Sequence, residues 1–144
     1  MSPRVEKLIR RTSLVTAGIG VVLSPIPLLD ELVLLPIYGV MASRIGKDHA
    51  LKFGEVPWRP IGATAVAGLA ARAAVNLTVS YVPGLAAVAN AVSALALTQF
   101  LGRYVDEACA HPEDVKALRV QEIVSAMRDS MKKEKPAEAP GPAS

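Results

Sequence analysis

Apolar residues along this chain gather in long stretches whose spacing is that of helices. Four such stretches cover about 3–23, 28–45, 61–79 and 84–108. The period-two alternation that marks a half-buried strand is absent, and Ala, Leu and Gly outnumber the β-branched and aromatic residues. The pattern therefore predicts an all-α protein.

The stretch 24–103 contains an internal two-fold repeat with an offset of 56 residues. The matched pairs are Ser24 with Ser80, Pro27 with Pro83, Gly46 with Gly102 and Lys47 with Arg103. Proline lacks an N–H group and disfavours a helix at the residue before it, so the prolines mark turns. We expect two proline-tipped antiparallel helical hairpins, over about 4–46 and about 61–108. Their turns contain Pro25, Pro27, Pro83 and Gly84.

The rest of the chain is more polar. Gly46 is expected to end the helix that precedes a polar connector, 47–60. A C-terminal amphipathic helix is predicted over about 112–133, because Pro112 is a favoured first helical residue and an apolar stripe follows at helical spacing. Residues 1–134 then form a single helical domain, and the tail 135–144, rich in Pro and Ala, is predicted to be disordered.

Composition narrows the classes of protein. Hydrophobic residues make up 51% of the 144 residues and the mean hydropathy is +0.35, at the upper edge for a soluble domain. The net charge of +3 fits a cytoplasmic membrane face or an acidic partner. The single cysteine, Cys109, excludes an internal disulfide and a zinc site of several cysteines.

The distribution of charge predicts association with a membrane. Asp, Glu, Lys and Arg are absent from 12–29 and from 73–102. Crossing the hydrocarbon takes roughly 20 apolar residues, and the uncharged parts of the first two helices are too short to span alone. Cations cluster at 4–11, at 44–59 and from Arg103 onward, and neither hairpin tip carries one. By the positive-inside tendency, both hairpins then insert from the cytoplasmic face.

Several cations are candidates for contact with lipid headgroups or an acidic partner. They are Arg44, Lys47, Lys52, Arg59, Lys132 and Lys133. The alternative is a soluble helical bundle in the cytoplasm, and Arg72 favours it because an arginine within the membrane is costly.

A few polar residues interrupt the apolar helices. Asn76 and Asn90 lie seven residues either side of Pro83, so they are predicted to face each other as a structural amide pair that fixes the register of the hairpin. Asp30 and Glu31 begin a helix, where carboxylates suit the positive end of the dipole. They are also candidate partners of the buried or interfacial Arg72, although hairpins of equal depth would separate them by roughly 12 Å.

Signatures of chemistry are missing from the sequence. His49 and His111 belong to no cluster with the spacing of metal ligands, and no phosphate-binding or nucleophile motif occurs. We therefore predict no catalytic residue, no metal and no cofactor. Nucleic-acid binding is not expected either, since the cations form no basic stripe with interleaved aromatic residues.

Five motifs resemble a known family. They are LSPIPLLD over 23–30, LPIYGVM over 35–41, RIG over 44–46, VPG over 82–84 and TQFLGRY over 98–104. In this order they are similar to the YcjF-type family of unknown function, a helical bacterial domain of inner-membrane proteins that also follows small GTPase domains. The resemblance covers about 12–108 and implies no catalytic residue. A GTPase domain is missing from this chain.

Together these observations predict a non-enzymatic bacterial protein on the cytoplasmic side of the inner membrane. It would act as an anchor, an adaptor or an oligomeric structural component, with itself, a separately encoded GTPase or another protein as partner. The alternatives are a soluble helical scaffold or binding module, and a small transport or pore component lined by Asn76, Asn90 or Arg72.

Overall fold

The computed structural model describes residues 1–22, 29–79, 85–116, 118 and 120–133. Its helices are α1 (Pro3–Val22), α2 (Leu29–Asp48), the 3₁₀ turn η1 (Phe53–Glu55), α3 (Trp58–Val79), α4 (Leu85–Ala110) and α5 (Val120–Lys133). The described residues contain no strand. The prediction of an all-α protein is confirmed.

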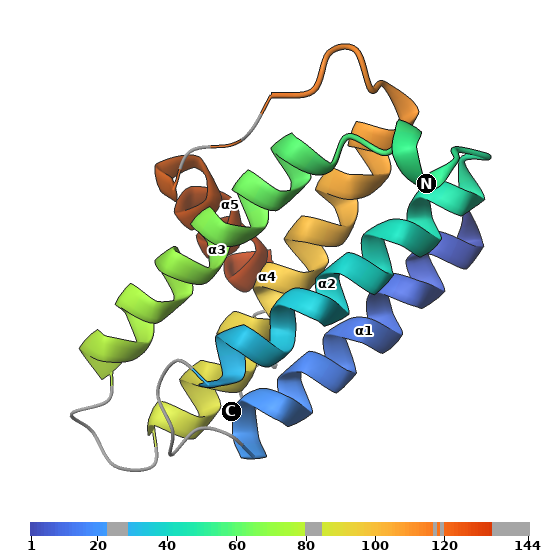
Figure 1. Ribbon diagram of the computed structural model, residues 1–144. Coiled ribbons are helices and arrows are strands. Elements are labelled where there is room, and N and C mark those ends of the chain that lie inside the picture. The colour runs from blue at the N-terminus through green and yellow to red at the C-terminus, as the bar shows by residue number, and fades with distance from the viewer. Residues whose placement is uncertain (23–28, 80–84, 117, 119, 134–144) are drawn as a thin grey trace, which may run out of the picture.

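Helices α1 to α4 lie side by side as an antiparallel bundle (Figure 1). At one end, α1 and α3 end and α2 and α4 begin; we call it the tip end. At the other, the connector end, η1 joins α2 to α3. The predicted turn residues Pro25, Pro27, Pro83 and Gly84 lie outside the described residues.

The N-terminal helix is capped by its own sequence. The backbone N–H of Val5 donates to Oγ of Ser2 at 3.2 Å, and Pro3 follows as the first helical residue. The Ser2 hydroxyl also donates to the carboxylate of Asp48, the last residue of α2. The start of α1 is thereby joined to the end of α2.

Helix α4 is the centre of the bundle, because it contacts α1, α2, α3 and α5. Its most extensive contact is with α1, so the closest helical pair joins the two expected hairpins and does not lie within either of them. Glycines allow this approach. A Cβ atom at Gly102 of α4 would lie 2.6 Å from Cγ1 of Ile9, and one at Gly68 of α3 would lie 2.4 Å from a methyl of Leu97.

The expected end of the second helix at Gly46 is wrong. The helix continues to Asp48, and Ala50 then adopts a left-handed backbone with φ of 58°. Gly46 serves packing instead, because a Cβ atom there would lie 2.6 Å from Cγ2 of the buried Val56. A glycine near a helix end therefore marked a close contact and not a cap.

The expected start of the last helix at Pro112 is also wrong, since α5 begins at Val120. The backbone before it finds partners outside a helix. The carbonyl of Lys116 accepts from the Tyr104 hydroxyl at 2.7 Å, and the N–H of Leu118 donates to Oγ1 of Thr64 at 3.1 Å. Helix α5 then packs on α3 and α4 through the fully buried Ile123.

The contact between Ile9 and Gly102 can be tested by adding one methyl group. Gly102→Ala should lower the stability by about 1–2 kcal/mol, because overpacking against a β-branched side chain exceeds the gain in helix propensity. Gly18→Ala is the matched control, since a Cβ atom at Gly18 meets nothing within 4 Å. It should leave the midpoint of urea unfolding, followed by circular dichroism, unchanged or raise it. Equal effects of both changes would contradict the close approach of α1 and α4.

Candidate functional site

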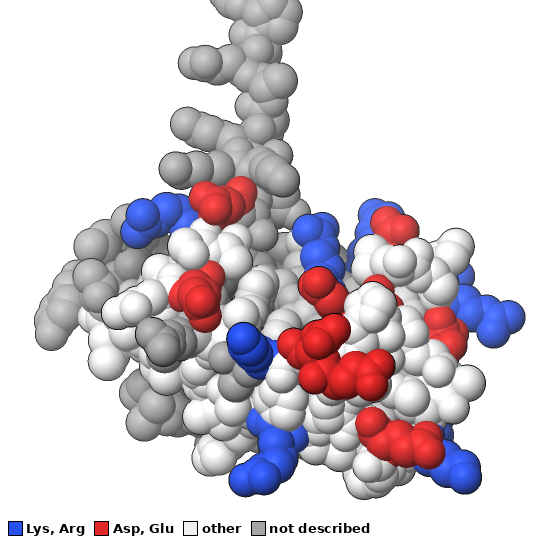
Figure 2. Space-filling model, turned by 90° about the horizontal axis from the view of Figure 1, so that it is seen from above, with Lys and Arg blue, Asp and Glu red and all other residues white. Residues whose placement is uncertain are grey.

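Charged side chains occupy the connector end of the bundle. Figure 2 looks onto that end and shows Lys and Arg side chains among Asp and Glu side chains. The sequence-predicted Arg44, Lys47, Lys52 and Arg59 are all exposed in this part of the molecule. They lie on α2, in the connector and at the start of α3, and Arg44 and Lys47 line one pocket with Phe53 and Trp58.

The other half of the bundle has a different surface. We define the tip half as 12–22 of α1, 29–40 of α2, 65–79 of α3 and 85–99 of α4. Among the described residues, the large apolar side chains that are exposed belong to this half, apart from Met1 and Phe53. They are Leu14, Val15, Val21, Val22, Leu32, Val33, Leu35, Val40, Val66, Val75, Leu77, Val88 and Val92. All four helices contribute to them.

The interior of the tip half contains a buried arginine. The guanidinium of Arg72 on α3 is fully buried and donates to the side-chain oxygen of Asn90 and to Oγ of Ser93, the latter at 3.2 Å. Its NH2 group also lies 3.3 Å from the carbonyl oxygen of Asn90. The Asn90 amide donates in turn to the carbonyl of Gly20 at 2.8 Å. Three helices are therefore joined through one side chain.

A second polar layer lies nearer the middle of the bundle. The hydroxyls of Thr16 on α1 and Thr98 on α4 are 2.8 Å apart, and both are fully buried. The hydroxyl of Tyr38 on α2 lies 3.3 Å from that of Thr98. These contacts join α1, α2 and α4 in the same way that Arg72 joins α1, α3 and α4.

The tip half thus exposes aliphatic side chains on all four helices and buries some polar side chains. Its interior also contains the buried aliphatic side chains of Leu34, Leu69 and Leu97, as the core of a water-soluble protein does. The sequence pattern did not predict which polar side chains are buried, because that depends on which face of each helix points inward.

The predicted pair of amides is only partly addressed by the structure. Asn90 is buried, and its side chain contacts Arg72 and Gly20. The side chain of Asn76 lies outside the described residues, so its pairing with Asn90 stays a prediction. The side chains of Asp30, Glu31, Lys132 and Lys133 also lie outside the described residues, so the roles predicted for them stay predictions.

The two expected hairpins are staggered along the bundle. The Arg72 network reaches Gly20, close to the end of α1, whereas Asn90 lies further from the start of α4. Helices α3 and α4 therefore extend beyond α1 at the tip end. The stagger of three residues amounts to about 5 Å at 1.5 Å per residue, so it covers less than half of the roughly 12 Å expected between Arg72 and Asp30 in hairpins of equal depth.

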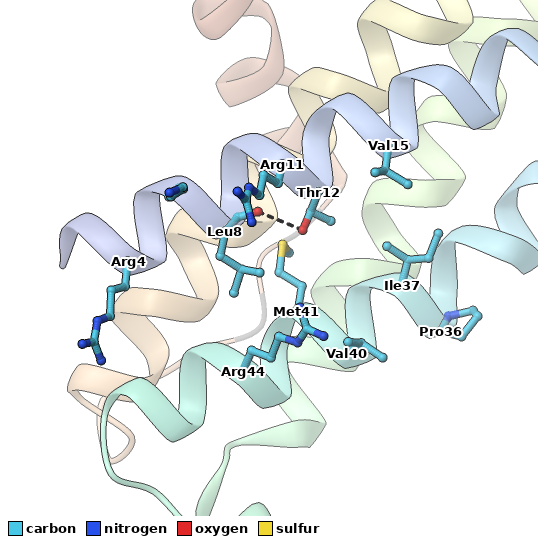
Figure 3. A pocket seen from close by; sticks show the side chains of 11 residues that line it. Arg4, Leu8, Arg11, Thr12, Val15, Pro36, Ile37, Val40, Met41 and Arg44 are labelled. Atoms are coloured by element: carbon cyan, nitrogen blue, oxygen red, sulfur yellow. Dashed lines mark hydrogen bonds between the residues drawn. The ribbon is translucent and has the colours of Figure 1, made fainter.

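A groove of about 620 Å³ runs between α1 and α2 (Figure 3). Its charged lining residues are all cations, namely Arg4, Lys7, Arg11 and Arg44. Its apolar lining includes Leu8, Val15, Ile37, Val40 and Met41. Of these cations, only Arg44 was among the predicted headgroup contacts. Arg4, Lys7 and Arg11 belong to the predicted cation cluster 4–11, and their spacing on one helical face was a usable signal.

The connector end also holds the only cysteine. Burial, reinforced by the negative charge of Asp106, raises the pKa of the Cys109 thiol to about 11. The thiol is therefore protonated at neutral pH and is a poor nucleophile. Asp106 itself lies 2.8 Å from Nε2 of His49. Within the described part of the chain, no group of three His, Cys, Asp or Glu residues is arranged to hold a metal ion.

Comparison with known proteins adds no identification, because no family model, no curated protein and no solved structure matches this chain. Of the helices as far as they are described, none is both long and apolar enough to cross a membrane.

The Arg72 network can be tested by removing its central acceptor. Asn90→Leu deletes the acceptor of a charged donor and the partner of the Gly20 carbonyl, so it should cost about 2–4 kcal/mol in urea unfolding. Adding Arg72→Met to Asn90→Leu should recover part of that loss, because the buried charge is then gone. Gln99→Leu, on the same helix and half-buried, is the control and should change little. A double variant less stable than Asn90→Leu alone would argue against the network.

Proposed function

We propose that this chain is a non-enzymatic membrane-associated protein whose tip half inserts into the hydrocarbon of a bilayer from one side. The observation that carries the proposal is the exposure of large aliphatic side chains on all four helices of that half. Its interior holds Arg72, Asn90, Thr16 and Thr98 beside the aliphatic Leu34, Leu69 and Leu97. An exposed apolar surface of this extent in water favours association or aggregation. In lipid the same aliphatic surface is solvated. Asp30 and Glu31 also belong to the tip half, and each would cost about 3 kcal/mol if it entered the hydrocarbon charged, which counts against insertion of the first turn of α2.

The apolar length supports insertion without crossing along α1. From Thr12 to Val22, α1 has about 11 uncharged residues, or about 17 Å at 1.5 Å per residue. The hydrocarbon of one leaflet is about 15 Å thick, half of a bilayer's 30 Å. Helix α4 offers a longer uncharged stretch before Arg103, and it extends further at the tip end.

The charges support one orientation. Arg11 on α1 and Arg44 on α2 are the first exposed cations met on leaving the tip half. At that level they lie where the anionic headgroups of the leaflet would be, each worth about 1 kcal/mol near the surface. The connector end then stays in water on the cytoplasmic side of a bacterial inner membrane, in line with the positive-inside tendency.

In this position the protein would act as an anchor or adaptor, or as an oligomeric structural component. The free connector end offers a surface of both charge signs to a protein partner. The resemblance of 23–104 to the YcjF-type family fits this role, and a separately encoded GTPase is one partner it implies. We further propose that the two helical pairs are repeats of one hairpin unit, as the matched Ser, Pro and Gly positions indicate.

The pore alternative receives less support. A pore would need Arg72 or Asn90 to line a channel between copies. Both side chains bond to each other within one copy of the bundle, and Arg72 is fully buried there. The soluble scaffold would use the tip half as a docking face for protein and is separated from insertion by the following test.

Vesicle flotation tests insertion through the tip half. Wild-type protein should float with phosphatidylcholine vesicles in the absence of anionic lipid. The combined change Val22→Glu, Leu77→Glu and Val88→Glu should abolish flotation, because a charge in hydrocarbon costs about 3 kcal/mol at each site. These residues are 75%, 64% and 61% exposed, so the fold should tolerate the changes.

Phe53→Glu is the matched control. Phe53 is 71% exposed but lies at the connector end, so this variant should float like the wild type. Circular dichroism should give the same helix content for all three proteins. A triple glutamate variant that still floats would refute insertion through the tip half. A wild type that stays with the buffer and sediments as a dimer would favour the soluble scaffold.

A further inference from the structure

We propose that the groove between α1 and α2 binds one anionic glycerophospholipid, with its phosphate held by Arg11 and Arg44 and one acyl chain lying along the apolar end of the groove. The inference rests on the proposed membrane association and adds the ligand that the inserted protein would take from the leaflet. It draws on the charge, the polarity gradient and the position of the groove.

The charge of the groove is one-sided. Arg4, Lys7, Arg11 and Arg44 line it, and no carboxylate does. In the described part of the chain, the ion pairs involve Asp106 at the connector end and none of these four cations. Cations that are brought together without a counter-charge repel one another, and an anion in the groove relieves that repulsion.

The polarity of the groove changes along its length. Arg4 and Lys7 lie toward the connector end, and Val15, Pro36 and Ile37 line the groove toward the tip end (Figure 3). From Arg4 to Val15 the groove follows α1 for about 17 Å. A free phosphate or a small anion would use only the first part. An amphiphile with a negative headgroup uses both.

Arg11 and Arg44 lie at the junction of the two parts. They come from facing helices, with Met41 between them in Figure 3, so both guanidinium groups would turn toward a bound phosphate in order to donate hydrogen bonds to it. The hydroxyl of Thr12 already donates to the carbonyl of Leu8 at 2.9 Å. The cations therefore supply the hydrogen-bond donors for the phosphate. The rest of a polar headgroup would extend toward Arg4 and Lys7.

The position of the groove matches the leaflet. The apolar end of the groove belongs to the tip half, and its cations lie next to it on the side of the connector end. An inserted bundle would therefore place the apolar end at the level of the acyl chains and the cations at the level of the phosphates. Val15 and Val40 are more than half exposed at the apolar end, which leaves the groove open sideways to lipid. Its volume of about 620 Å³ lies in the range of small-molecule sites, about 300–1,000 Å³.

The test uses a lipid that needs no membrane. Dihexanoyl-phosphatidylglycerol below its critical micelle concentration is titrated into the full chain and followed by calorimetry. Wild-type protein should bind it saturably with one site. Dihexanoyl-phosphatidylcholine and glycerol phosphate should each bind at least tenfold more weakly, because one lacks the net charge and the other lacks the chains.

Two pairs of variants separate the groove from general attraction. Arg11→Gln with Arg44→Gln should weaken phosphatidylglycerol binding at least tenfold. Arg10→Gln with Lys116→Gln removes the same charge at exposed positions outside the groove and should leave the affinity within twofold. Val15→Asn with Val40→Asn adds no charge, so it should also weaken phosphatidylglycerol binding while leaving glycerol phosphate binding unaffected.

Three results would overturn the proposal. Equal losses of phosphatidylglycerol affinity in the Arg11 and Arg44 double variant and in its control outside the groove would show attraction to net charge only. Equal affinity for glycerol phosphate and phosphatidylglycerol would show an anion site without a lipid. Binding that never saturates would show that there is no site. Flotation with phosphatidylcholine vesicles is independent of all three, so the lipid site and the insertion of the tip half can fail separately.

Discussion

The guanidinium of Arg72 is the constraint on which the tip half depends. A buried charge needs hydrogen-bonding partners, and here they come from a side chain on α4, a serine one turn further along and, through Asn90, a backbone carbonyl of α1. These partners fix the relative heights of α1, α3 and α4. The exterior is then free to be apolar, since Val, Leu and Ala residues need no particular partner.

The same constraint explains why α4 lies at the centre. It carries Asn90, Ser93 and Thr98, which serve both polar layers, and Gly102, which lets Ile9 approach. Hydrogen bonds set the register where the helices have polar faces. Where the helices have no polar faces, close packing against glycine sets their register. The α1–α2 groove opens between the hydrogen bond of Ser2 to Asp48 at one end and the hydroxyl layer of Thr16 and Tyr38 at the other, with Leu8 and Met41 between the helices.

Prolines and charges made most of the helical layout predictable. The bounds of α1 to α4 agree with the expected ranges to within a few residues, because the helices coincide with the long apolar runs and Pro25, Pro27 and Pro83 separate those runs. A proline alone was not a sufficient signal, since Pro36 lies inside α2. The start of α5 was not predictable from Pro112, since the bonds of Lys116 and Leu118 to Tyr104 and Thr64 are tertiary. The role of Gly46 was missed for a similar reason. The local sequence gives no sign that the side chain of Val56 packs against Gly46. The groove could not be derived either, because it depends on the rotation of α1 relative to α2.

The single tryptophan lies where the connector meets the side of α2. Trp58 begins α3, its indole N–H donates to the carbonyl of Phe53 at 2.7 Å, and its ring packs 4.8 Å from that of Phe53. Both aromatic residues line a pocket with Pro36, Val40 and Arg44 of α2. The fluorescence of Trp58 therefore reports on the connector and on the adjoining surface of α2, next to the proposed level of the headgroups.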